Sequence, residues 1–74
     1  MNDQISNEER DDALKRMKKI LDEFDNTRKE AEIIYKEAVE KGDLELQKKL
    51  LKNINKIKQE EESIQNLIYE IREI

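Results

Sequence analysis

A single glycine, Gly42, interrupts a chain that contains no proline and that repeats apolar residues at helical spacing on both sides of it. Apolar residues that recur at alternating steps of three and four form one stripe of a helix that packs along a partner helix. Glycine is well suited to the left-handed backbone just after a helix end. The pattern therefore predicts an all-α chain in which a tight turn joins two long helices.

The two stripes also predict how the helices meet. The first stripe consists of Leu14, Met17, Leu21, Phe24, Arg28, Ala31, Tyr35 and Ala38, and the second of Gln47, Leu50, Ile54, Ile57, Glu61, Ile64, Ile68 and Ile71. If the chain folds back at Gly42, residues whose numbers add up to 85 share a layer, so that Leu21 meets Ile64. No insertion or skip interrupts this register. We therefore expect an antiparallel, coiled-coil-like hairpin.

Capping residues mark the ends of both helices. Ser6, with a glutamate three residues later, matches a capping box and starts a first helix of about 7–41. A turn of about 42–43 follows, in which Asp43 can cap a second helix of about 44–73. The 74 residues hold one domain, residues 1–74.

A second set of capping residues allows an alternative fold. The segment Asp25–Thr27 is rich in capping side chains, and Thr27 with Glu30 repeats the capping-box spacing. A break there would divide the first helix and give a three-helix bundle. Against the break, the apolar stepping continues from Phe24 through Arg28 without a slip.

Composition and the flanking residues predict association. The chain is 46% charged and 35% hydrophobic, as coiled coils are, and a lone hairpin buries only one seam. Further apolar residues recur beside the stripes, or widen the first stripe near the turn. They favour a second seam that joins two hairpins in a homodimeric four-helix bundle. The interface candidates are Ile20, Ile33, Ile34, Leu46, Leu51, Leu67 and Ile74.

Arg28 and Glu61 are the two charged residues set into the stripes, and their layers are adjacent. The arginine can therefore reach the carboxylate diagonally. Such a pair adds little net stability but penalises shifted registers, in which one charge would be left alone. We interpret the two residues as a register pair, and a functional polar site built on them is the alternative.

The sequence offers little for catalysis. It has no histidine and no cysteine, which removes the usual zinc ligands, the commonest general base and the thiol nucleophile. A single glycine cannot build a phosphate-cradling loop. We therefore expect no enzyme activity, no metal, no cofactor and no small-molecule substrate.

Charge is segregated along the chain, although the net charge is −4. The segment 48–58 carries five lysines and no acid. In the antiparallel register it runs beside four glutamates, and we expect pairing with them to occupy the lysines, which makes nucleic-acid binding the weaker interpretation. These glutamates are Glu30, Glu32, Glu37 and Glu40.

The same register brings acidic residues of the two helices together. Because like charges repel, we expect a second hairpin or a foreign protein to supply cations there. This region is the candidate surface for a different partner protein. Its residues are Asp22, Glu23, Asp25, Glu60 and Glu62, beside Glu61.

Three functions remain for a chain of this kind. The leading hypothesis is a self-associating structural or adaptor module that binds proteins through helix faces. The alternative is a small acidic regulator that binds and blocks a partner protein, and the third is a nucleic-acid binder that uses the lysines at 48–58. The sequence shows no targeting signal and no run of roughly 18 apolar residues. We therefore expect a cytoplasmic protein that does not bind membranes.

Overall fold

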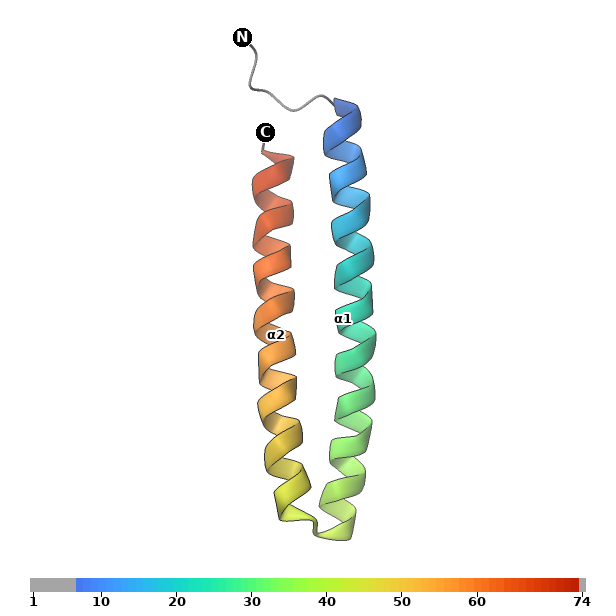
Figure 1. Cartoon of the computed structure of the whole chain (residues 1–74), viewed down its shortest axis with the longest axis vertical. Coiled ribbons are helices and arrows are strands. Elements are labelled where there is room, and N and C mark those ends of the chain that lie inside the picture. The colour runs from blue at the N-terminus through green and yellow to red at the C-terminus, as the bar shows by residue number, and fades with distance from the viewer. Residues whose placement is uncertain (1–6, 74) are drawn as a thin grey trace.

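The computed structural model describes residues 7–73 and contains two α-helices, α1 (Asn7–Lys41) and α2 (Leu44–Arg72). The helices lie side by side and run in opposite directions, with the turn at one end of the rod (Figure 1). The rod measures 61 × 15 × 13 Å. The predicted all-α helical hairpin is therefore confirmed. The expected cap at Ser6 and the interface candidate Ile74 lie outside the described residues.

The turn is closed by backbone hydrogen bonds that only a left-handed residue allows. Gly42 has a φ of 71° and donates its N–H to the Val39 carbonyl at 3.1 Å, while the Asp43 N–H reaches the Ala38 carbonyl at 2.9 Å. This pair of bonds is a Schellman motif. The Asp43 carboxylate then accepts the N–H of Leu46 at 3.1 Å, so it caps α2 as expected.

Two contacts and one shared hollow, at three heights on the rod, agree with the predicted register. Near the turn, the side-chain amide of Gln47 donates a hydrogen bond to the Ala38 carbonyl at 3.3 Å. At mid-height, Arg28 reaches Glu61, one layer away on the diagonal. Near the other end, Leu21 and Ile68 line one hollow.

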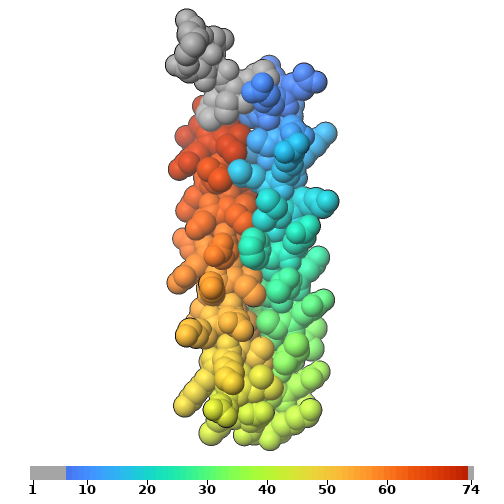
Figure 2. All heavy atoms as spheres, in the orientation of Figure 1, coloured from blue at the N-terminus to red at the C-terminus, as the bar shows by residue number. Residues whose placement is uncertain are grey.

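The seam is thin. Every stripe position is buried or half-buried, yet only Ala38, Ile54 and Ile68 are fully buried among the described residues. The side chains of α1 and α2 meet along the length of the rod (Figure 2). Two helices can cover each other on one side only, so all other sides face solvent.

The alternative three-helix bundle is wrong, because α1 runs without a break through Asp25–Thr27. The Thr27 hydroxyl donates to the Glu23 carbonyl one turn earlier, at 3.0 Å, and so bonds within the helix instead of capping a new one. The Asp25 carboxylate accepts bonds from Arg28 and Lys29. The side chains of Thr27 and Asp25 are therefore engaged elsewhere, and α1 continues past them.

Gly42→Ala should lower the free energy of unfolding by about 1 kcal/mol, because alanine disfavours the left-handed conformation. Nothing lies within 4 Å of a Cβ placed there, so the cost comes from the backbone alone. Gly42→Asn is the matched control and should lose roughly half as much, since asparagine tolerates this conformation better. Urea unfolding followed by circular dichroism measures both. An alanine variant as stable as the parent would contradict this account of the turn.

Candidate interaction surfaces

The seam divides the remaining surface of the rod into two sides. With Leu14 and Gln47 taken as heptad a positions, the g positions of both helices flank the seam on one side and the e positions on the other. We call these sides the g face and the e face. The g face consists of Ala13, Ile20, Thr27, Ile34, Lys41, Leu46, Asn53, Glu60 and Leu67, and the e face of Asp11, Lys18, Asp25, Glu32, Val39, Leu44, Leu51, Lys58, Gln65 and Arg72.

The g face carries most of the exposed aliphatic side chains that the sequence marked as interface candidates. Ile20, Ile34, Leu46 and Leu67 lie on it, and each is more than a third exposed. A hollow of about 190 Å³, lined in part by Ile20 and the ring of Phe24, indents this face. An aliphatic surface with a hollow can accept side chains from a second helical element.

The other interface candidates lie elsewhere. Leu51 lies on the e face near the turn, together with the exposed Val39 and Leu44. Ile33 lies at an f position, on the side of α1 that points away from the seam, and is 58% exposed. The candidates therefore belong to more than one surface, and the g face holds the largest group.

Arg28 is the centre of a charge network on the e-face side of the seam. Its Nε donates to Oε1 of Glu61 on α2 at 2.8 Å, and its Nη1 donates to Oε1 of Glu32 at 2.8 Å. Its Nη2 donates to Oδ1 of Asp25, whose other oxygen lies 3.0 Å from Nζ of Lys29. The Arg28 side chain is only 21% exposed and that of Glu61 only 17%. One guanidinium thus holds three carboxylates.

The network stabilises the charged forms of Asp25 and Arg28. The hydrogen bond from Lys29, together with the charges of Lys29 and Arg28, lowers the pKa of the Asp25 carboxyl. The hydrogen bond to Glu61 and the neighbouring carboxylates raise the pKa of Arg28. The arginine therefore remains a cation, and the polar groups buried within the described residues all have partners.

This network changes the interpretation of the acidic candidates. The sequence predicts that a second molecule supplies cations to this region, but for Asp25 they come from Arg28 and Lys29 of the same chain. Glu61 pairs with Arg28, as the adjacent layers predict. The other acidic candidates are exposed, and no ion pair within residues 7–73 reaches them. They are Asp22, Glu23, Glu60 and Glu62.

The expected pairing of the lysines at 48–58 with glutamates of α1 is wrong. We call residues 48–58 the lysine segment. In the part of the chain that the structure describes, no ion pair involves any lysine of this segment. Most of these lysines occupy b, c and f positions and so point away from α1, while Glu32 turns toward Arg28. The segment therefore presents uncompensated positive charge.

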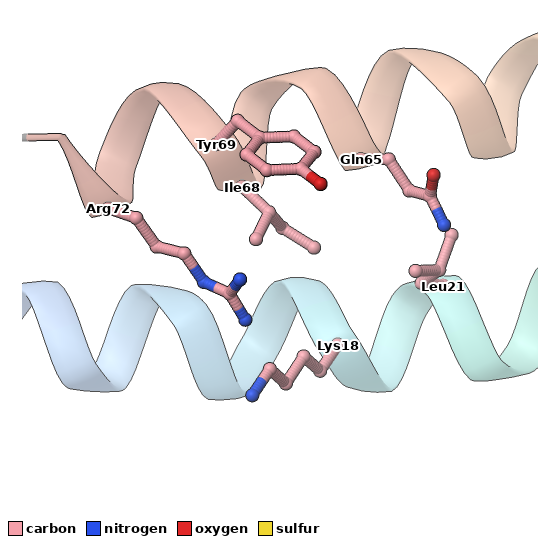
Figure 3. Close-up of a pocket in the computed structure, with 6 residues that line it drawn as sticks. All are labelled: Lys18, Leu21, Gln65, Ile68, Tyr69 and Arg72. Carbon is pink, nitrogen blue, oxygen red and sulfur yellow. The ribbon is translucent and has the colours of Figure 1, made fainter.

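A second hollow, of about 200 Å³, lies on the e face toward the end of the rod that is remote from the turn. Arg72 reaches toward α1 from α2, Lys18 lies on α1, and Ile68 points into the space between the helices (Figure 3). Gln65 and the ring of Tyr69 complete the lining, and the side chain of Tyr69 is largely exposed. The hollow is shallow and open, and it holds no acid or base in a buried position.

The described residues offer no set of groups suited to metal chemistry. No cluster of three or more acidic, histidine or cysteine side chains among residues 7–73 could hold a metal ion. Neither α1 nor α2, as far as they are described, is apolar enough over a sufficient length to cross a bilayer.

Comparison of the chain with protein-family models, with curated proteins and with solved structures gave no match.

Replacing Arg28 by leucine should destabilise the hairpin more than replacing Glu61. Arg28→Leu leaves Asp25, Glu32 and Glu61 without their shared cation, whereas Glu61→Leu leaves Arg28 with two carboxylates. The double leucine variant should melt above both single variants and above the parent, because a leucine pair packs in the seam without desolvating charge. Thermal unfolding of the four proteins measures this order. A double variant that melts below Arg28→Leu would contradict it.

Proposed function

We propose that this protein is a self-associating helical hairpin, a non-enzymatic module whose g face packs against a second copy to form a four-helix bundle. The supporting observation is the row of exposed aliphatic residues at heptad spacing on that face, Ile20 and Ile34 on α1 and Leu46 and Leu67 on α2. Residues that recur at this spacing build the second seam of helix bundles. The outward sides of such a bundle remain available to other proteins.

The size of the hairpin supports the same proposal. Small folds without disulfides or metals need surface from elsewhere to bury enough apolar area. This chain has no cysteine, and its seam fully buries only Ala38, Ile54 and Ile68 among the described residues. Covering the g face would remove four more aliphatic side chains from water, each of which contributes roughly 1 kcal/mol when its exposed part is buried.

The e face is the poorer choice for this seam. Its apolar residues Val39, Leu44 and Leu51 gather at the turn. Farther along, the Arg28 network and then Lys18 and Arg72 occupy it. A second hairpin on this face would bury charged groups over most of its length, which is costly unless each one is paired.

Sedimentation equilibrium tests the proposal. The parent should be a dimer, and the double variant Ile20→Lys, Leu67→Lys should be a monomer, because two lysines per chain would be buried in the new seam. The matched control is Ile33→Lys, Tyr69→Lys, which makes the same charge change at residues that are 58% and 62% exposed and lie off the g face. The control should remain a dimer. A parent that stays monomeric at millimolar concentration would refute self-association.

The lysine segment supports a second candidate function, the binding of nucleic acid through its phosphates. The observation in its favour is that its lysines, with Asn53, Asn55 and Gln59 beside them, are exposed and have no carboxylate partner in the described structure. Lysines in such a row can neutralise successive phosphates. A hollow of about 510 Å³ lies among Lys52, Lys56 and these amides.

Binding to duplex DNA and to RNA at low salt tests this candidate by fluorescence anisotropy. The variant Lys49→Gln, Lys52→Gln, Lys56→Gln should lose binding by about tenfold or more, because each phosphate contact also releases counterions. The control Lys15→Gln, Lys18→Gln, Lys19→Gln removes the same charge from α1 and should lose much less. Phosphate contacts are strongest at low salt. Equal losses in both variants, or no binding by the parent at about 20 mM salt, would therefore exclude this function.

A further inference from the structure

We propose that the second copy docks with its turn at the same end of the bundle, so that α1 of each hairpin packs against α2 of the other. This inference rests on the proposed self-association through the g face and adds the relative direction and the register of the two hairpins. It is carried by charged residues at the outer edges of the g face, most of which have no ion pair within residues 7–73.

Symmetry sets the register of this docking. Two hairpins whose turns lie at the same end are related by a two-fold axis parallel to the rod. Rotation about such an axis leaves the height of every residue unchanged, so the copies cannot slide along each other. Within one hairpin, residues whose numbers add up to about 85 lie at one height, as Ala38 and Gln47 do. The same rule therefore gives the contacts between α1 and α2 of the second copy.

The c positions of both helices lie at the outer edges of the g face, because each is one turn from a g position on the side away from the seam. When two g faces meet, the c positions flank the new seam, as e and g positions flank a coiled coil. At equal height, c residues whose numbers add up to 86 meet: Arg16 with Glu70, Glu23 with Ser63, Glu30 with Lys56, and Glu37 with Lys49. Three of these four contacts join opposite charges.

The lysine segment thereby gains partners that it lacks within one hairpin. Lys49 and Lys56 are exposed, as are Glu37 and Glu30, and no ion pair within residues 7–73 involves any of them. In one chain, these lysines and glutamates lie at similar heights but on opposite outer edges of the g face. Docking of a second copy brings each lysine to the edge that carries the glutamates. The pairing that fails within the chain therefore becomes possible between chains.

The same docking gathers aliphatic side chains in one layer. Ile20 and Leu67 lie at nearly equal height on the g face, and they are 44% and 41% exposed in the single hairpin. A two-fold axis along the rod brings both residues of both copies to the same height. Four aliphatic side chains then meet in the centre of the bundle, as in the core layers of four-helix bundles.

Docking with the turns at opposite ends gives fewer favourable contacts. In the register that brings Ile20 beside Ile34 of the second copy, two pairs of opposite charge meet: Arg16 with Glu37, and Lys56 with Glu60. Lys49 then faces a leucine. Each docking also has one like-charge contact, because Glu23 approaches Glu60 when the turns are together and Glu30 when they are apart. The same-end docking therefore gains one more complementary pair from each copy, and differences of this kind select between arrangements.

Two variants with one charge reversal each test the pairing. Lys49→Glu places two carboxylates together at both symmetry-related contacts, and Glu37→Lys places two ammonium groups together there. Each variant alone should weaken the dimer roughly tenfold. In an equimolar mixture, a dimer with one chain of each kind joins opposite charges at both contacts. Its dissociation constant, measured by sedimentation equilibrium, should return to within about threefold of the parent's.

The control for this test is Glu40→Lys, which makes the same charge change at an exposed f position. It should dimerise as tightly as the parent. Because the chain has a net charge of −4, net charge alone would tighten the Glu37→Lys dimer, so a loss there reports the contact. Two results would overturn the inference: a Glu37→Lys protein that dimerises as well as the control, or a mixture that associates no better than the single variants.

Distances between spin labels test the direction independently. The chain has no cysteine, so Lys19→Cys, Asn26→Cys and Glu40→Cys each introduce one labelling site, at exposed f positions of α1. With the turns at the same end, two labels lie at equal height whichever site is used. The three distances should therefore be nearly the same. With the turns at opposite ends, the separation along the rod changes by about 3 Å for each residue, twice the helical rise. No crossing point could then make all three distances equal.

Unequal distances in a protein that sediments as a dimer would overturn the docking direction and leave the proposed self-association intact. A protein that sediments as a monomer and gives no intermolecular distance at any site would instead overturn the self-association, and the inference with it. Circular dichroism of the labelled proteins verifies that the helices are retained.

Discussion

The pairing of two heptad stripes in a single register is the constraint on which the rest of this structure depends. It determines which positions form the g face and the e face. It also determines which charged residues of α1 and α2 lie at the same height along the rod. A slip of one turn would separate the Gln47 amide from the Ala38 carbonyl and Arg28 from Glu61. Neither contact contributes much net stability, but both are lost together in a shifted register, and shifted registers are thereby disfavoured.

Arg28 also determines how charge is distributed over the surface. Because one guanidinium binds Asp25, Glu32 and Glu61, it withdraws Glu32 from the lysine segment and neutralises one part of the acidic region. The remaining acids and the lysine segment are left exposed on neighbouring stretches of the rod. Segregated charge of this kind does not stabilise an isolated hairpin. It can, however, favour a partner surface of complementary charge over one of like charge.

Much of the fold could be predicted from the sequence because the signals were local and periodic. The position of the turn followed from Gly42 and Asp43, and the reach of Arg28 toward Glu61 followed from adjacent layers. The possible break at Thr27 was wrong because a hydroxyl that can cap a helix can also bond one turn back within it. The lysine pairing was wrong because proximity along the rod does not bring b, c and f positions toward the seam.

The thin seam limits the apolar burial that the folding of one hairpin provides. Only Ala38, Ile54 and Ile68 are fully buried among residues 7–73, so the hairpin alone has little apolar burial to set against the entropy of ordering two long helices. Whatever covers the g face binds the folded hairpin and not the unfolded chain, and therefore stabilises it in proportion to the logarithm of its concentration. A second copy is always present when the protein is made. Self-association is thus the simplest source of the burial that one hairpin lacks.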